Sequence, residues 1–192
     1  MSSRTVLCLA AASLVGTVLA AQVPPAAVQI SGAVSALPEG LRDGATVLGY
    51  SNYHHLVILR QGTNEMICLA DDPSQKEWHV ACYHKDLEPF MARGRELRNE
   101  GANRAKVDSV RLAEAQTGKL KMPDHPAALF ELFGLRDSLN AKTGIASGAE
   151  PLYVLYIPYA TAEATGLPTL PGGGKPWLMY AGKPWAHVMI SP

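Results

Sequence analysis

Two cysteines in the segment MICLADDPSQKEWHVACYH, residues 66 to 84, constrain the fold of this chain more than any other feature. The runs on either side of the DPSQKE turn are rich in β-branched, aromatic and other apolar residues, so we expect a hairpin. A register that sets Cys68 opposite Cys82 also sets Leu69 opposite Ala81, which places apolar residues against each other. Directly opposed strand positions lie close enough for a disulfide, so the sequence predicts a Cys68–Cys82 bridge. Such a bridge closes a loop of about 15 residues and stabilises the fold by roughly 3 kcal/mol.

A cysteine-ligated metal is the alternative, with His79, Cys82 and His84 as ligands. On a regular strand Cys82 and His84 share one face while His79 projects from the other, so the three cannot converge on one ion without a bulge. A redox role would normally use Cys-x-x-Cys, which the chain lacks. The disulfide is therefore the favoured interpretation.

The same register brings Asp71 opposite His79. A carboxylate that holds an imidazole in one tautomer is what a general base requires, so these two residues are the candidate catalytic pair. The alternative is a hydrogen-bonded pair that closes the mouth of the hairpin, and it is favoured because no nucleophile is identifiable nearby. Neither G-x-S-x-G nor H-E-x-x-H occurs in the sequence.

The first 21 residues have the pattern of a secretory signal peptide. Arg4 precedes an apolar run over 6–19, and small residues suited to cleavage follow. The run is shorter than the roughly 20 residues that a membrane span needs, so a retained anchor is the weaker interpretation. Cys8 would leave with the signal, and the remaining two cysteines would form an even pair in an oxidising compartment. We expect a secreted or periplasmic protein without a membrane span.

The charge of the chain gives no reason to expect a polyanionic partner. Without Arg4, 16 basic side chains face 17 acidic ones, a net charge of −1 with histidine neutral. No long-range field would attract nucleic acid or an anionic membrane surface.

After a loosely ordered lead-in over 22–44, residues 45–192 are expected to form a single α+β domain. Its core would be an antiparallel β-meander of about five or six strands, packed by two or three helices. The expected strands span 45–50, 54–61, 65–71, 78–84, 152–159 and 186–190, and the expected helices 86–101, 104–117 and 124–134. Gly94, on the apolar face of the first helix, would allow a close approach to its partner.

The GKPW sequence occurs at 174–177 and again at 182–185. It places Trp177 and Trp185, with Tyr180 between them, in a proline-stiffened segment where exposed rings could bind a glycan or a peptide. Glu163, on the preceding loop, could supply a polar partner. The favoured alternative is that both tryptophans turn inward, because large aromatic side chains are usually well buried.

The six histidines are scattered, and their spacing specifies no known metal site. His84 and His187 are weak candidate ligands for a divalent metal, with His125 and one of His54 and His55 as further donors; structural histidines are favoured. No cofactor is predicted.

The sequence therefore predicts a non-catalytic protein of the cell envelope that binds a small molecule, glycan or peptide. The alternative is a small hydrolase or metal-dependent enzyme that uses His79 with Asp71.

Overall fold

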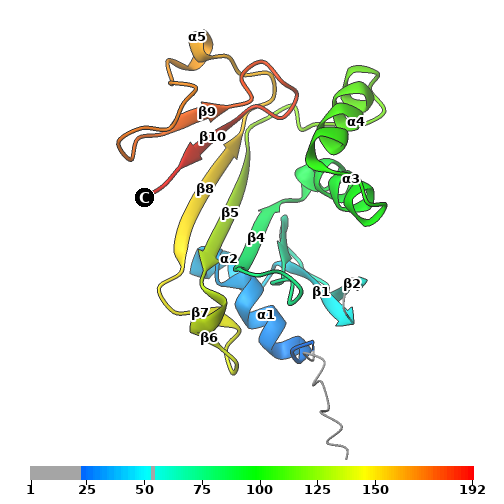
Figure 1. The fold of residues 1–192 in the computed structure, drawn as a ribbon, viewed down its shortest axis with the longest axis vertical. Helices are drawn as coiled ribbons and strands as arrows, with labels where there is room; N and C mark the ends of the chain where they lie inside the picture. Colours follow the sequence, from blue (N-terminus) through cyan, green and yellow to red (C-terminus); the bar gives the residue numbers. More distant parts are fainter. Residues whose placement is uncertain (1–22, 53–54) are drawn as a thin grey trace, which may run out of the picture.

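The computed structural model describes residues 23–52 and 55–192, and the expected signal peptide lies outside this part. The fold is α+β, with one large sheet in the order β2-β1-β3-β4-β5-β8-β10-β9 and a small β6-β7 sheet (Figure 1). The main strands are β1 (Thr46–Asn52), β2 (His55–Arg60), β3 (Met66–Leu69), β4 (Trp78–His84), β5 (Ala127–Gly134), β8 (Glu150–Tyr156), β9 (Trp177–Met179) and β10 (His187–Ile190). The small sheet pairs β6 (Leu139–Asn140) with β7 (Ile145–Ala146). The main sheet has eight strands, more than the five or six expected.

The predicted hairpin is confirmed in its register. β3 and β4 are antiparallel, with Cys68 opposite Cys82 and Leu69 opposite Ala81. The two cysteines form a disulfide, and both are fully buried. The apolar residues of the two strands, together with the position of the cysteines, were sufficient to define this pairing.

The expected meander is wrong at one point. β3 pairs with β1 in parallel, so β2 lies at the edge of the sheet instead of between them. A long crossover is unnecessary because the chain leaving β2 needs only to pass the first residues of β1. At this passage a Cβ on Gly62 would lie 2.2 Å from the Thr46 nitrogen, and the Gly62 amide donates to Thr46 Oγ1 at 3.0 Å. Glycine therefore permits the close contact that makes a short parallel connection possible.

The expectation of a loosely ordered lead-in is also wrong. Residues 22–44 contain α1 (Ala26–Val34) and the short α2 (Glu39–Arg42). The Gln29 side-chain amide donates to the Tyr50 carbonyl at 2.9 Å and accepts from the Tyr50 amide at 2.7 Å, which joins α1 to β1. Ala33 and Leu37 pack in a core cluster with Val47, the disulfide and Trp78. Small residues here signal close packing rather than disorder.

The third predicted helix is a strand. Residues 127–134 form β5, which lies between β4 and β8 in the centre of the sheet. Its apolar residues point to both faces, because α1 covers one face and the helices after β4 lie over the other (Figure 1). A continuous apolar run of this kind does not distinguish a central strand from a buried helix.

The other two predicted helices are present. A 3₁₀ turn η1 (Lys85–Leu87) leads into α3 (Glu88–Asn99), and α4 (Arg104–Gln116) follows. Arg93 on α3 donates to Glu114 on α4 from Nε and Nη2, each at 2.9 Å. Gly94 allows the expected close approach, since a Cβ there would lie 1.7 Å from Nη2 of Arg111.

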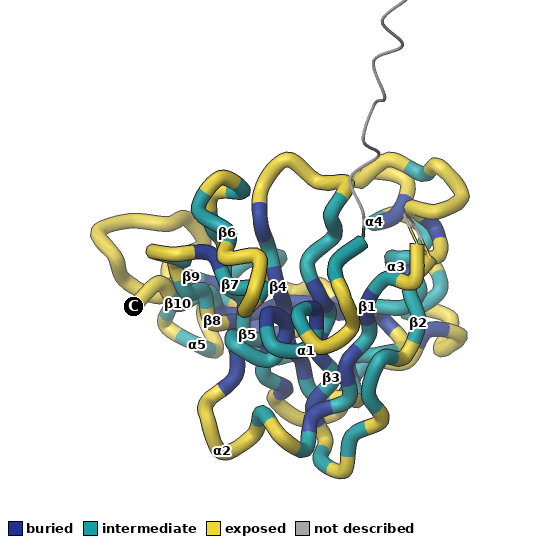
Figure 2. The backbone as a smooth tube through the Cα atoms, turned by 90° about the horizontal axis from the view of Figure 1, so that it is seen from below, coloured by how far each residue is buried: buried dark blue, intermediate teal, exposed yellow. Residues whose placement is uncertain are grey.

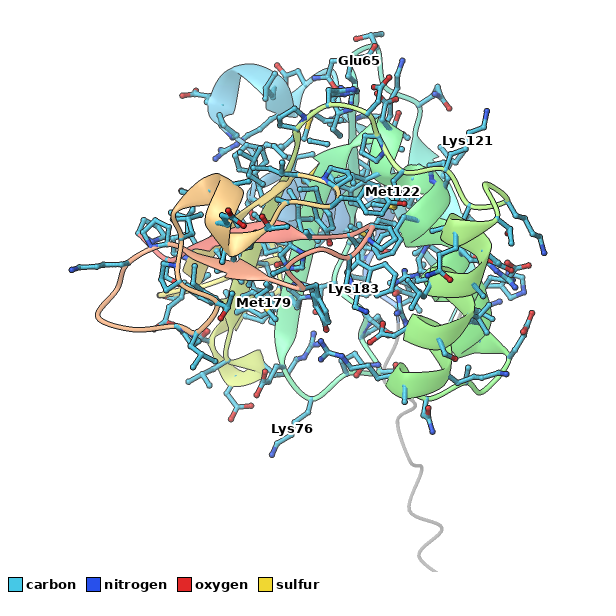
Figure 3. All side chains as sticks on the ribbon, turned by 90° about the horizontal axis from the view of Figure 1, so that it is seen from above. Glu65, Lys76, Lys121, Met122, Met179 and Lys183 are labelled. Carbon is cyan, nitrogen blue, oxygen red and sulfur yellow. A yellow bond between two sulfur atoms is a disulfide. The ribbon has the colours of Figure 1, made fainter. Side chains whose placement is uncertain are left out.

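Buried residues concentrate in the central strands and on the inner side of α1, while most connecting loops are exposed (Figure 2). In the segment before β5, Lys121 is exposed, and Met122 packs against the core between helices and sheet (Figure 3). Among residues 23–52 and 55–192, no helix has the length and apolar character of a membrane span.

Candidate functional site

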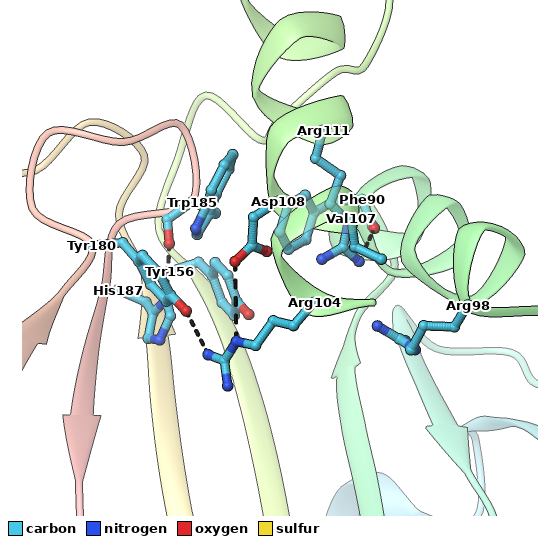
Figure 4. A pocket seen from close by; sticks show the side chains of 10 residues that line it. All are labelled: Phe90, Arg98, Arg104, Val107, Asp108, Arg111, Tyr156, Tyr180, Trp185 and His187. Atoms are coloured by element: carbon cyan, nitrogen blue, oxygen red, sulfur yellow. Dashed lines mark hydrogen bonds and ion pairs between the residues drawn. The ribbon is translucent and has the colours of Figure 1, made fainter. Parts of the chain in front are cut away.

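A cavity of about 350 Å³ lies where α3 and α4 meet the C-terminal part of the sheet (Figure 4). The helices contribute three arginines, one aspartate and two apolar side chains. The strands and the loop between β9 and β10 contribute two tyrosines, a tryptophan and a histidine. The lining residues are Phe90, Arg98, Arg104, Val107, Asp108, Arg111, Tyr156, Tyr180, Trp185 and His187.

Arg111 is the most unusual member of this set because only 7% of its surface is exposed. Its Nη2 donates to the Phe90 carbonyl at 2.6 Å, and its guanidinium carbon lies 3.8 Å from the centre of the Phe90 ring. Its Nε is buried without a hydrogen-bond partner. Burial, and then repulsion by Arg98, lower the pKa of Arg111 to about 10, so the side chain remains a cation at neutral pH.

Neither Arg98 nor Arg111 has a carboxylate within 4.0 Å in the described part of the chain. Burial lowers the pKa of Arg98, and the positive charge of Arg95 adds to this effect. Arg95 itself is paired, since its Nη2 donates to Glu88 at 2.6 Å. Both of these unpaired arginines line the cavity.

Arg104 lies at the open side of the cavity, with 78% of its side chain exposed. It donates to the Tyr180 hydroxyl, and its Nε lies 4.0 Å from Oδ2 of Asp108 (Figure 4). The Tyr180 contact raises the pKa of Arg104. Asp108 is the one carboxylate among the lining residues, so three guanidinium groups face a single negative charge.

The opposite wall is aromatic. The ring of Trp185 stacks on Phe90 with centroids 5.7 Å apart, and the rings of Tyr156 and His187 are 4.8 Å apart. His187 Nδ1 donates to the Trp185 carbonyl at 2.8 Å, which leaves Nε2 as an acceptor. Burial lowers the pKa of His187 and raises that of Tyr156, so both are neutral near pH 7.

The predicted aromatic site is only partly assembled. Tyr180 and Trp185 line the cavity, but Trp177 on β9 and Glu163 in the exposed short helix α5 (Ala162–Thr165) are not among its lining residues. The favoured alternative, that the tryptophans turn inward, is confirmed for Trp185, which is 5% exposed because it packs between the helices and the sheet.

The arginines of the cavity were missed by sequence reasoning, which gave none of them a functional role. The available signal was Arg111, four residues after Val107 and therefore on the same face of α4. An arginine in the position of a core residue indicates a buried charge with a specific environment.

His79 and Asp71 do not form the expected imidazole–carboxylate contact. Asp71 accepts from the His79 backbone amide at 3.1 Å and binds Arg136, which follows β5 in the 3₁₀ turn η2 (Arg136–Ser138). The His79 imidazole is instead 3.0 Å from Glu131 on β5 and stacks on Phe133. The hairpin-closing alternative thus describes Asp71 better, and Glu131 is the carboxylate that orients the imidazole.

The two weak metal candidates lie in different places. His187 belongs to the cavity, whereas His84 at the end of β4 lies close to Asp86 and His125. His54 is outside the described residues.

Comparison of the chain with known protein families, with curated proteins and with solved structures finds no match.

Proposed function

We propose that this protein binds a small organic anion in the cavity between α3, α4 and the end of the sheet, and that it does so without converting its ligand. The ligand class is an acidic sugar or a short peptide with a free carboxylate. The observation that carries the proposal is the buried guanidinium of Arg111, which has no carboxylate partner and lies beside Arg98 and Arg104.

The charge balance favours an anion. Burying a cation is costly unless it is paired, and the repulsion between Arg98 and Arg111 adds to that cost. A carboxylate or phosphate in the cavity would offset both the cost of burying the cation and the repulsion between the two arginines. It would also accept hydrogen bonds from the guanidinium groups.

The aromatic wall suits the rest of such a ligand. Tyr156, Tyr180 and His187 offer polar atoms, and Trp185 offers an apolar face. The volume of about 350 Å³ is at the small end of the range for ligand sites. This combination of guanidinium groups and aromatic rings suits a small ligand that carries both a negative charge and an apolar face.

The composition of the lining supports binding rather than chemistry. It includes no serine, threonine, cysteine or lysine, and its one carboxylate, Asp108, faces Arg104 at 4.0 Å. Secretion or a periplasmic location belongs to the same proposal, and the Cys68–Cys82 disulfide is compatible with an oxidising compartment.

Isothermal titration with matched pairs of probes tests the proposal. Galacturonate is compared with galactose, and N-acetyl-dialanine with its amide, because each pair differs in one negative charge. We expect the acids to bind and the neutral partners to bind at least tenfold more weakly, with affinity falling as salt is added.

Arg104→Gln should weaken binding of the acids at least tenfold, while Lys76→Gln, which removes an exposed charge on the 72–77 loop (Figure 3), should leave it unchanged. Equal binding of acids and neutral partners, equal effects of the two substitutions, or failure of all acids to bind at millimolar concentration would overturn the proposal.

A further inference from the structure

A second cluster of titratable side chains lies at the end of β4, and none of them lines the cavity between α3, α4 and the sheet. His84 ends β4, Asp86 follows it in η1, and His125 lies just before β5. β4 and β5 are antiparallel neighbours with Tyr83 opposite Leu129, so the end of one strand and the approach to the other meet at the same edge of the sheet.

The distances between the donor atoms fit a single metal ion. Asp86 Oδ2 is 3.6 Å from His84 Nδ1 and 3.3 Å from His125 Nε2. The donor atoms of all three residues lie within 4.8 Å of one another. In a tetrahedral site with bonds of about 2.0–2.1 Å, two ligand atoms are separated by about 3.3 Å. Shifts of a few tenths of an ångström to about an ångström would therefore suffice.

A neighbouring carboxylate fixes one imidazole for this role. Asp124 Oδ1 is 3.0 Å from His125 Nδ1, so the Nδ1–H group donates a hydrogen bond to Asp124 and Nε2 presents its lone pair toward Asp86. A carboxylate behind a histidine is the usual support of a metal-bound imidazole, because it sets the tautomer and raises the basicity of the ligand.

His84 presents its acceptor nitrogen to the same place. Its Nδ1 accepts from the Asp86 backbone amide at 3.4 Å, a contact longer than a normal hydrogen bond and therefore inexpensive to exchange for a metal ligand. The imidazoles of His84 and His125 are perpendicular, at 89°, with centroids 5.7 Å apart, so they approach Asp86 from different directions.

From this geometry we propose that His84, Asp86 and His125 form a binding site for a divalent transition metal, with Zn²⁺ as the expected ion. Two imidazole nitrogens and one carboxylate oxygen suit Zn²⁺ better than Ca²⁺ or Mg²⁺, which prefer oxygen ligands. The side chains are 27%, 39% and 47% exposed in chain order, so a fourth position on the ion faces solvent. The site is independent of the anion-binding proposal, since the two share no residue.

Titration of the mature, metal-free protein with ZnCl₂ in a non-chelating buffer tests the site, and Co²⁺ absorbance reports its tetrahedral geometry. We expect one equivalent to bind. His125→Gln and His84→Gln should each lower the affinity at least tenfold, and Asp124→Asn should lower it 10- to 100-fold. His55→Gln, which removes an exposed histidine at the start of β2, is the matched control and should leave the affinity unchanged.

Circular dichroism of each variant verifies that it is folded, and Asp124, fully exposed, can be substituted without disturbing packing. The proposal is overturned if the wild-type protein binds no stoichiometric Zn²⁺, or if His125→Gln and His55→Gln bind it equally well.

Discussion

Gly94→Ala provides the sharpest test of how α3 and α4 pack. On helix propensity alone the substitution should stabilise the protein by about 1 kcal/mol, because alanine is the better helix former. The structure predicts the opposite sign. The added Cβ would lie 1.7 Å from Nη2 and 2.4 Å from Cζ of Arg111, so the guanidinium would have to move.

The cost follows from the contacts that Arg111 would lose. Its hydrogen bond to the Phe90 carbonyl involves a charged donor and is worth about 1.5–3 kcal/mol. The contact between its guanidinium and the Phe90 ring adds about 0.5–2 kcal/mol. After subtraction of the propensity gain, we expect Gly94→Ala to lower the free energy of unfolding by about 1–4 kcal/mol.

Gly40→Ala is the matched control. Gly40 lies in α2, and a Cβ there would meet nothing within 4 Å, so we expect stabilisation of about 0.4–1 kcal/mol. Urea denaturation of both variants, followed by circular dichroism, compares the signs directly. In an Arg111→Met background the cost of Gly94→Ala should largely disappear, since the flexible Met side chain can yield. The packing argument fails if Gly94→Ala stabilises the protein as Gly40→Ala does, or if the cost is unchanged in the Arg111→Met background.

Three further outcomes are expected. Replacing Cys68 and Cys82 together by alanine should lower the free energy of unfolding by about 3 kcal/mol, because the bridge joins residues 14 apart; equal urea midpoints for the variant and the oxidised wild type would contradict this. Arg136→Leu should cost about 2–4 kcal/mol and expose the 72–77 loop to protease, because the guanidinium binds Asp71 and the carbonyls of residues 72, 75 and 77; unchanged cleavage of that loop would refute the role. Burial lowers the pKa of His187, so the unfolded chain binds its proton first and stability should fall as the pH drops below the ordinary histidine value of 6.5; His187→Gln should flatten that fall in melting temperature, and an unchanged slope would disprove the assignment.

The β3–β4 hairpin could be predicted from sequence because its determinants are local. A short turn, two strands of suitable composition and two cysteines left only one register that buried apolar residues together. The helices after β4 were predictable for the same reason, since their apolar spacing and the glycines that end them lie within one segment.

The errors concern contacts between distant segments. Most apolar residues of α1 are alanine or valine, and the helix packs closely against a distant loop, since an added Cβ on Gly32 would lie only 2.4 Å from the Gly144 carbonyl oxygen. The sequence of residues 22–44 does not by itself indicate that contact. The cavity arginines were missed similarly, because the pairing of Arg93 with Glu114 depends on how the two helices pack.

The misassigned strand β5 explains why the candidate catalytic pair was misjudged. Once residues 127–134 are a central strand, Glu131 lies opposite Ala81 on β4 and reaches the imidazole of His79. Arg136, just after the end of the same strand, binds Asp71, so this carboxylate pairs with a guanidinium group instead of the His79 imidazole. The segment before β5 carries His125 to Asp86. One strand placement therefore determines which partners His79, Asp71 and Asp86 have, and an interpretation of this segment as a helix cannot reveal those contacts.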